Sequence, residues 1–99
     1  MILKIVNGRL DLLSDSGGRI RTIAQSNVID AALSDDEKSV LITYSNGRTD
    51  LCTDSGGGKS TVAESNAVKA IFHNSDILIT LKNGDMELRN QNGGKIRSI

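Results

Sequence analysis

Short apolar runs separated by polar turns recur along the chain, and three of the runs lie just before an Asn-Gly pair. These runs are Ile2–Val6, Val40–Tyr44 and Ile77–Leu81. Their residues are apolar on both faces, which predicts strands that are buried on both sides. Asn-Gly is the strongest short signal for a β-hairpin, because both turn positions must tolerate positive φ. We therefore expect each run to turn back at once into a second strand.

The segment after each Asn-Gly alternates between polar and apolar residues. The three segments are RLDLLSDS, RTDLCTDS and DMELRNQN, and each carries an acid at its third position: Asp11, Asp50 and Glu87. Period-two alternation predicts a half-buried strand, with the acids on a solvated face. A more polar stretch follows each Gly-Gly pair and is typical of an outer edge strand. These stretches are Arg19–Ala24, Lys59–Ala63 and Lys95–Ile99.

Two further segments, Val28–Leu33 and Ala67–Phe72, combine apolar residues with alanine. They are too short and uncapped to be helices, and their small side chains suit strands in a crowded centre. Each follows a Ser-Asn corner and leads into a polar turn. One complete unit therefore contains four strands: Val28–Leu33, Ser39–Tyr44, Arg48–Cys52 and Lys59–Ala63.

The whole chain is an internal repeat. Each Gly-Gly follows its Asn-Gly by ten residues, and the unit recurs after 39 and then 37 residues. We expect one repeat domain, residues 1–99, with units 1–27, 28–66 and 67–99. The first unit lacks the inner strand, which gives eleven strands. In this alignment Met1 matches Val40 and Ile77 at the head of the second strand.

Residues 28–57 resemble one blade of a WD-repeat-type β-propeller. The family's turns correspond here to Ser34–Glu37, Asn46-Gly47 and Ser55–Gly57, although its Trp-Asp dipeptide and Gly-His corner are absent. The resemblance implies an all-β chain of propeller blades, about 2.75 four-stranded antiparallel repeats. Three blades do not close a ring, so we expect homo-oligomerisation to complete it, as a two-fold dimer. A β-trefoil, which also has three four-stranded repeats, is the alternative.

Composition narrows the class of function. The chain has 99 residues, twelve basic and twelve acidic side chains, and no block of like charge, so we expect no nucleic-acid partner. No apolar run approaches a membrane span, and no signal peptide is recognised, so we expect no membrane partner. A single cysteine, Cys52, excludes an internal disulfide framework and favours a reducing, cytoplasmic setting.

Few residues are candidates for phosphate binding, metal binding or catalysis. The Ser55–Thr61 segment imitates a phosphate loop, but position 53 is Thr where that motif needs Gly, and the segment matches two other glycine turns. His73 is the only histidine, which argues against a zinc site, and no catalytic constellation is evident. Cys52 is interpreted as an ordinary strand residue. We expect no enzyme, no cofactor and no metal.

The sequence favours a structural or protein-interaction module, a self-assembling propeller scaffold that presents loops to a protein partner. A sugar-binding, lectin-like propeller is the alternative, although such lectins usually stack sugars on Trp, which this chain lacks. Candidate binding residues lie in or beside the loops of one ring face: Asn7, Arg9, Asn27, Asn46, Arg48, Asn66 and Asn83.

Overall fold

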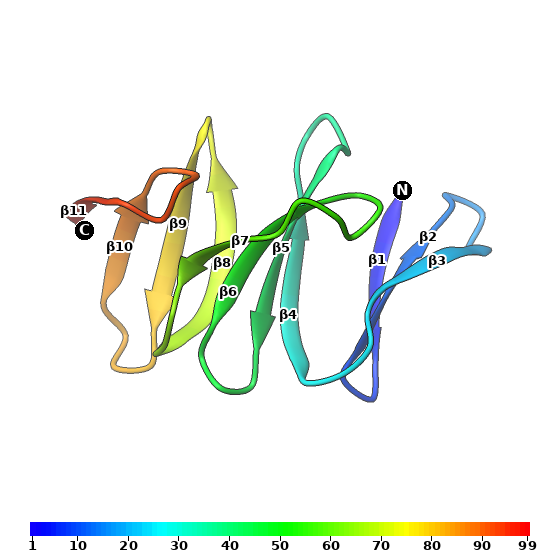
Figure 1. Ribbon diagram of the computed structural model, residues 1–99, viewed down its shortest axis with the longest axis horizontal. Helices are drawn as coiled ribbons and strands as arrows, with labels where there is room; N and C mark the ends of the chain where they lie inside the picture. Colours follow the sequence, from blue (N-terminus) through cyan, green and yellow to red (C-terminus); the bar gives the residue numbers. More distant parts are fainter.

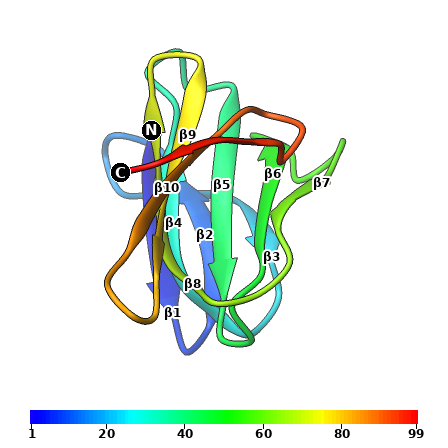
Figure 2. The ribbon, with the colours of Figure 1, turned by 90° about the vertical axis from the view of Figure 1, so that its left-hand side faces the viewer.

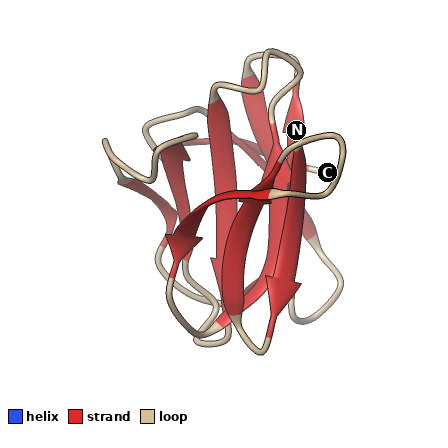
Figure 3. Cartoon of the chain, turned by 90° about the vertical axis from the view of Figure 1, so that its right-hand side faces the viewer, coloured by secondary structure: helices blue, strands red, loops and turns tan.

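The computed structural model describes residues 1–99, and its regular structure consists of eleven antiparallel strands without a helix (Figures 1 and 3). The all-β prediction is confirmed. No helix long and apolar enough to cross a membrane is present. The strands are β1 (Ile2–Val6), β2 (Arg9–Leu13), β3 (Arg19–Ala24), β4 (Val28–Leu33), β5 (Ser39–Tyr44), β6 (Thr49–Thr53), β7 (Ser60–Ala63), β8 (Ala67–His73), β9 (Asp76–Leu81), β10 (Met86–Arg89) and β11 (Lys95–Ser98).

Strand pairing stays within three separate sheets. The first sheet has the order β1-β2-β3, the second β4-β5-β6-β7, and the third β8-β9-β10-β11. A β-trefoil would need strands of all three repeats to close one barrel, and the chain forms no such barrel. The first sheet has no inner strand, so one edge of β1 is unpaired, whereas β4 and β8 cover the same edge of β5 and β9.

The three Asn-Gly hairpins use two kinds of turn. In the first, Asn7 and Gly8 both have positive φ, 51° and 80°, as a two-residue turn requires. In the other two hairpins, only Gly47 and Gly84 have positive φ. There the loop has three residues, and the glycine N–H donates to the residue before the loop. The prediction that both Asn-Gly positions adopt positive φ is therefore correct only for the first hairpin.

This difference in loop length shifts the register of β1 by one residue. Ile2 pairs with Leu13 in the position where Val40 pairs with Cys52, so the alignment of Met1 with Val40 is wrong. A shift of one residue exchanges the faces of a strand. Leu3 consequently packs toward the second sheet, while Ile2 and its neighbour Lys4 lie on the opposite face.

The sheets stack face to face, and the two joints between them contain the core (Figures 1 and 2). The first joint buries Leu10 and Leu12 against Val40 and Ile42. The second joint buries a further seven residues: Leu41, Val62, Ala63, Ala67, Ala70, Ile77 and Ile79. The central β5 strand is buried on both faces as predicted. β1 is not, because no sheet covers the outer side of the first repeat.

The stack is open at both ends. Its radius of gyration of 12.8 Å is that of a folded domain of this length, and its extents are 38 × 26 × 21 Å. Each end presents one sheet face that no other sheet covers. We call the outward face of the first sheet, which carries Ile2 and Leu13, the N-terminal open face. The outward face of the third sheet, which carries Leu78 and Leu88, is the C-terminal open face.

Candidate functional site

One contact between repeats forms where each of the first two Asn-Gly hairpins meets the corner before the next inner strand, at the lower edge of Figure 1. The carbonyl of Gly8 accepts a hydrogen bond from the N–H of Val28 at 2.9 Å, and Gly47 accepts one from Ala67 at 3.0 Å. A Cβ on Gly47 would lie 2.4 Å from the backbone nitrogen of Asn66. Glycine is therefore required for this close approach.

A second contact between repeats is made by arginine at the outer strands. The Nη1 of Arg21 donates to the carbonyl of Asp54 at 3.0 Å and so joins the first repeat to the second. The Nη1 of Arg89 donates to the carbonyl of Val62 at 2.9 Å and joins the third repeat to the second. The sequence pattern indicates no role for either arginine, because the carbonyl that each one binds lies in another repeat.

The acids of the alternating strands are not solvated, which corrects the prediction from the sequence. Asp11 is only 3% exposed, because Arg9 pairs with it at 2.8 Å and the Thr22 hydroxyl donates to it at 2.8 Å. Hydrogen bonds from Arg9, then from Thr22, hold the pKa of Asp11 below its ordinary value. Asp50 is 4% exposed. Its two partners are the equivalent side chains of the second repeat, Arg48 and Thr61.

The third repeat has a glutamate, Glu87, at the position of Asp11 and Asp50, and this glutamate has different partners. Asp85 stands where the other repeats have arginine, and Arg89 approaches Glu87 from the other side at 2.7 Å. Lys95 pairs with Glu87 at 3.3 Å. The hydrogen bonds from Arg89, reinforced by Lys95, hold the pKa of Glu87 below its ordinary value.

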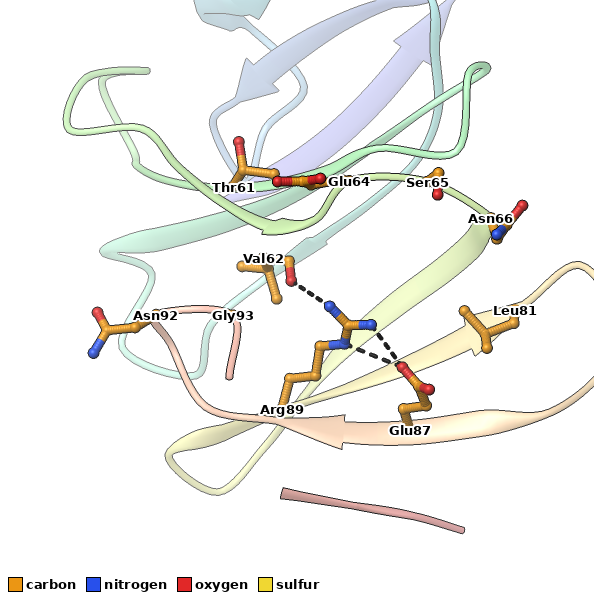
Figure 4. Close-up of a pocket in the computed structure, with 10 residues that line it drawn as sticks. All are labelled: Thr61, Val62, Glu64, Ser65, Asn66, Leu81, Glu87, Arg89, Asn92 and Gly93. Carbon is orange, nitrogen blue, oxygen red and sulfur yellow. Dashed lines mark hydrogen bonds and ion pairs between the residues drawn. The ribbon is translucent and has the colours of Figure 1, made fainter. Parts of the chain in front are cut away.

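The largest pocket, of about 470 Å³, lies between the second and third sheets (Figure 4). Ten residues line it, and only two of them are hydrophobic. Arg89 crosses its floor between Glu87 and the Val62 carbonyl, as the dashed lines show. Thr61 and Asn66 contribute further polar groups from the second repeat. The pocket offers hydrogen-bonding groups of both kinds but no aromatic platform.

The corresponding position between the first and second sheets holds no pocket. Tyr44 stands there in place of Leu81, since both residues precede the three-residue loop of their hairpin. The Arg48 guanidinium lies 4.9 Å from the centre of the Tyr44 ring, in a cation–π contact. Tyr44 is 8% exposed, so these two side chains occupy the space that remains open in the next joint.

The seven candidate binding residues lie at the same edge of the stack, where they serve turns and corners. The side-chain oxygens of Asn46 and Asn83 accept hydrogen bonds from the backbone two residues on. Asn7, Asn27 and Asn66 adopt positive φ, and the carbonyls of the last two accept a hydrogen bond from the adjacent hairpin. Arg9 and Arg48 pair with the acids of their own strands. Only Asn66 lines the largest pocket.

The remaining candidates do not form a reactive site. Within Ser55–Thr61, residues 55–59 form a turn and Ser60 begins β7, where a phosphate loop requires a helix. His73 is exposed at the end of β8, and no group of three His, Cys, Asp or Glu side chains is placed to hold a metal ion. Cys52 is buried, and burial raises the pKa of its thiol, which opposes formation of the reactive thiolate.

Each open face corresponds to one of the two sheet surfaces that pack together in the joints inside the chain. Gly56 and Gly93, in the turns before β7 and β11, pack against the preceding repeat, where an added Cβ would lie 3.3 and 3.0 Å from its backbone oxygens. The equivalent Gly17 has nothing within 4 Å, and neither does Gly84 in the last hairpin. The surfaces that join repeats inside the chain are therefore present, but uncovered, at both ends.

No protein-family description and no curated protein sequence matches the chain.

Proposed function

We propose that the chain is a non-catalytic scaffold, an arc of three WD-repeat-like propeller blades that two copies complete as a ring. The observation that carries this proposal is the succession of similar joints along one stack, which ends in two uncovered faces. Repeat units of this kind bury their faces only against neighbours. Exposed Ile2 and Ile99, at 44% and 64%, mark the two ends as surfaces suited to burial.

Two copies provide six repeats, a common ring size for propellers, and a closed two-fold ring leaves no free end. Three copies would provide nine repeats, which is more than propellers usually contain. In the ring, the hairpins and corners with the seven candidate residues form one continuous face available to a protein partner. A reducing, cytoplasmic setting suits the buried free thiol of Cys52.

Light scattering coupled to size-exclusion chromatography tests this function. We expect a mass of about twice the 10.6 kDa of one chain at micromolar concentration. A folded monomer across the accessible concentration range contradicts the proposal.

A second function, binding of a small polar ligand such as a sugar, is favoured by one observation: the polar 470 Å³ pocket beside Arg89. Pockets of this size accommodate small molecules. A glycan array with the natural chain and Asn66→Ala tests it, because Asn66 lines the pocket from the corner. Binding that the variant loses supports the sugar-binding function. No signal from the natural chain contradicts it.

A further inference from the structure

The joints inside the chain define what each open face is shaped to receive. We propose that the C-terminal open face of one copy packs on the N-terminal open face of a second copy, with Arg97 donating a hydrogen bond to the carbonyl of Asp15 in that copy. This inference rests on the proposed scaffold function and names the surface through which it acts.

The C-terminal open face has the same construction as the face that the second sheet buries. Leu78 occupies the position of the fully buried Leu41, since Leu78 pairs with Leu88 as Leu41 pairs with Leu51. Leu78, Leu88 and Ile99 surround an apolar hollow of about 180 Å³, beside His73 and Arg97. A hollow of this composition at the end of a stacked array is suited to apolar side chains of another sheet.

The N-terminal open face supplies such side chains. Ile2 and Leu13 form a cross-strand pair at the position where Val40 and Cys52 pack into the first joint. The turn at Gly17 is open, whereas the same turn at Gly56 packs against the backbone of Ile23. Gly17 is therefore free to receive the outer strand of another copy.

Arg97 provides the specific polar contact. It pairs with Leu88 as Arg21 pairs with Leu12, so the two arginines hold equivalent positions in β11 and β3. Arg21 uses this position to bind the carbonyl of Asp54 in the next repeat. Arg97 is exposed, and its side chain makes no hydrogen bond or ion pair within its own chain. Asp15 holds the turn position in the first repeat that Asp54 holds in the second, and its side chain is 88% exposed.

Lys4 distinguishes this joint from the two inside the chain, because it stands where Ile42 and Ile79 are buried. The first sheet has no inner strand, so the Lys4 ammonium can reach water past the free edge of β1 while its methylenes contact the partner sheet. The outer half of the joint, with Arg97 and the Gly17 turn, then carries the specificity.

A second copy is the occupant because the two open faces carry matching halves of one joint. The hollow faces the Ile2 and Leu13 pair, the free guanidinium faces the Asp15 carbonyl, and the open Gly17 turn faces β11. A different apolar partner would cover the hollow without using Asp15. Binding of such a partner would therefore not change in the Asp15→Arg variant.

Sedimentation equilibrium on four variants tests the interface. Arg97→Glu removes the donor and should raise the dimer dissociation constant about tenfold or more, as expected for a hydrogen bond to a charged donor. Asp15→Arg should weaken the dimer through repulsion from Arg97. The double variant Arg97→Glu/Asp15→Arg should recover affinity to within about threefold of the natural chain. Lys59→Glu, an equal change of charge in an exposed turn of the middle repeat, should have no effect.

The possible results distinguish failure of this interface from failure of the proposed scaffold function. A natural chain that stays monomeric overturns both. If the natural chain dimerises and Arg97→Glu weakens the dimer no more than Lys59→Glu does, the proposed scaffold function is retained. The interface proposed here is then overturned. Single variants that weaken the dimer without recovery in the double variant contradict the pairing of Arg97 with Asp15. Far-ultraviolet circular dichroism of each variant shows that folding is intact.

Discussion

Gly47 and Gly84 occupy the same place in successive hairpins, with φ of 88° and 92°. Alanine is strained at both positions by roughly 1–2 kcal/mol. At Gly47 the new Cβ would also meet the Asn66 nitrogen at 2.4 Å, whereas at Gly84 it would meet nothing within 4 Å. We predict that Gly47→Ala lowers the free energy of unfolding by roughly 1–3 kcal/mol more than Gly84→Ala. Urea denaturation measures the difference, and equal losses would contradict the joint geometry.

The lowered pKa values of Asp11 and Glu87 determine how the free energy of unfolding should depend on pH. Both pKa values are lowered in the folded chain, Asp11 mainly by Arg9 and Glu87 mainly by Arg89. A lowered pKa stabilises the fold at pH values above the unfolded pKa, about 4, and this stabilisation is lost as pH falls through the folded pKa. The urea midpoint should therefore be nearly constant from neutral pH to about 5 and fall below about 4.

The double variant Asp11→Asn/Glu87→Gln is the matched comparison for this titration. It should be less stable than the natural chain at neutral pH and should lose less stability on acidification. The same acid-induced loss in both proteins would show that these carboxylates are not responsible for it.

At the scale of strands, equivalent leucines separate folding from assembly. Leu41 in β5 is fully buried between the second and third sheets, and Leu78 in β9 has the same position on an open face. Leu41→Ala should cost about 2–5 kcal/mol in the free energy of unfolding. Leu78→Ala should cost less than about 1.5 kcal/mol in dilute, dissociated protein and should weaken the dimer instead. Similar losses in dilute protein would contradict the open end.

The strands themselves could be predicted from the sequence because local signals specify them. Alternation and glycine turns placed β1, β3, β4 and β5 with their observed bounds and β6, β7, β8, β9 and β11 within one residue. The sheet order also followed, because short hairpins join neighbours in the chain. These features depend on residues close together in the sequence.

Three features could not be predicted, because they depend on a single missing loop residue or on contacts between neighbouring strands and sheets. The slip of β1 depends on one missing loop residue, which an alignment on Asn-Gly conceals. Burial of Asp11 depends on Thr22 in the next strand, eleven residues away. The pocket beside Arg89 depends on the replacement of Tyr44 by Leu81, whose effect is visible only when the sheets are stacked.

At the scale of the whole molecule, the structure is an open series of three sheets with two similar joints. Such a series either closes into a ring or continues to grow, depending on the rotation from one repeat to the next. The proposed function requires closure, because a growing series would produce filaments. The number of copies at which growth stops is therefore the quantity that defines the assembly.

Sedimentation velocity over a wide concentration series measures this quantity most directly. We predict a shift from the 10.6 kDa chain to a species of twice that mass, with no larger species at higher concentration. A mass that continues to rise with concentration would mean that the joints do not close a ring, and a single monomeric species at every concentration would mean that the open faces do not associate.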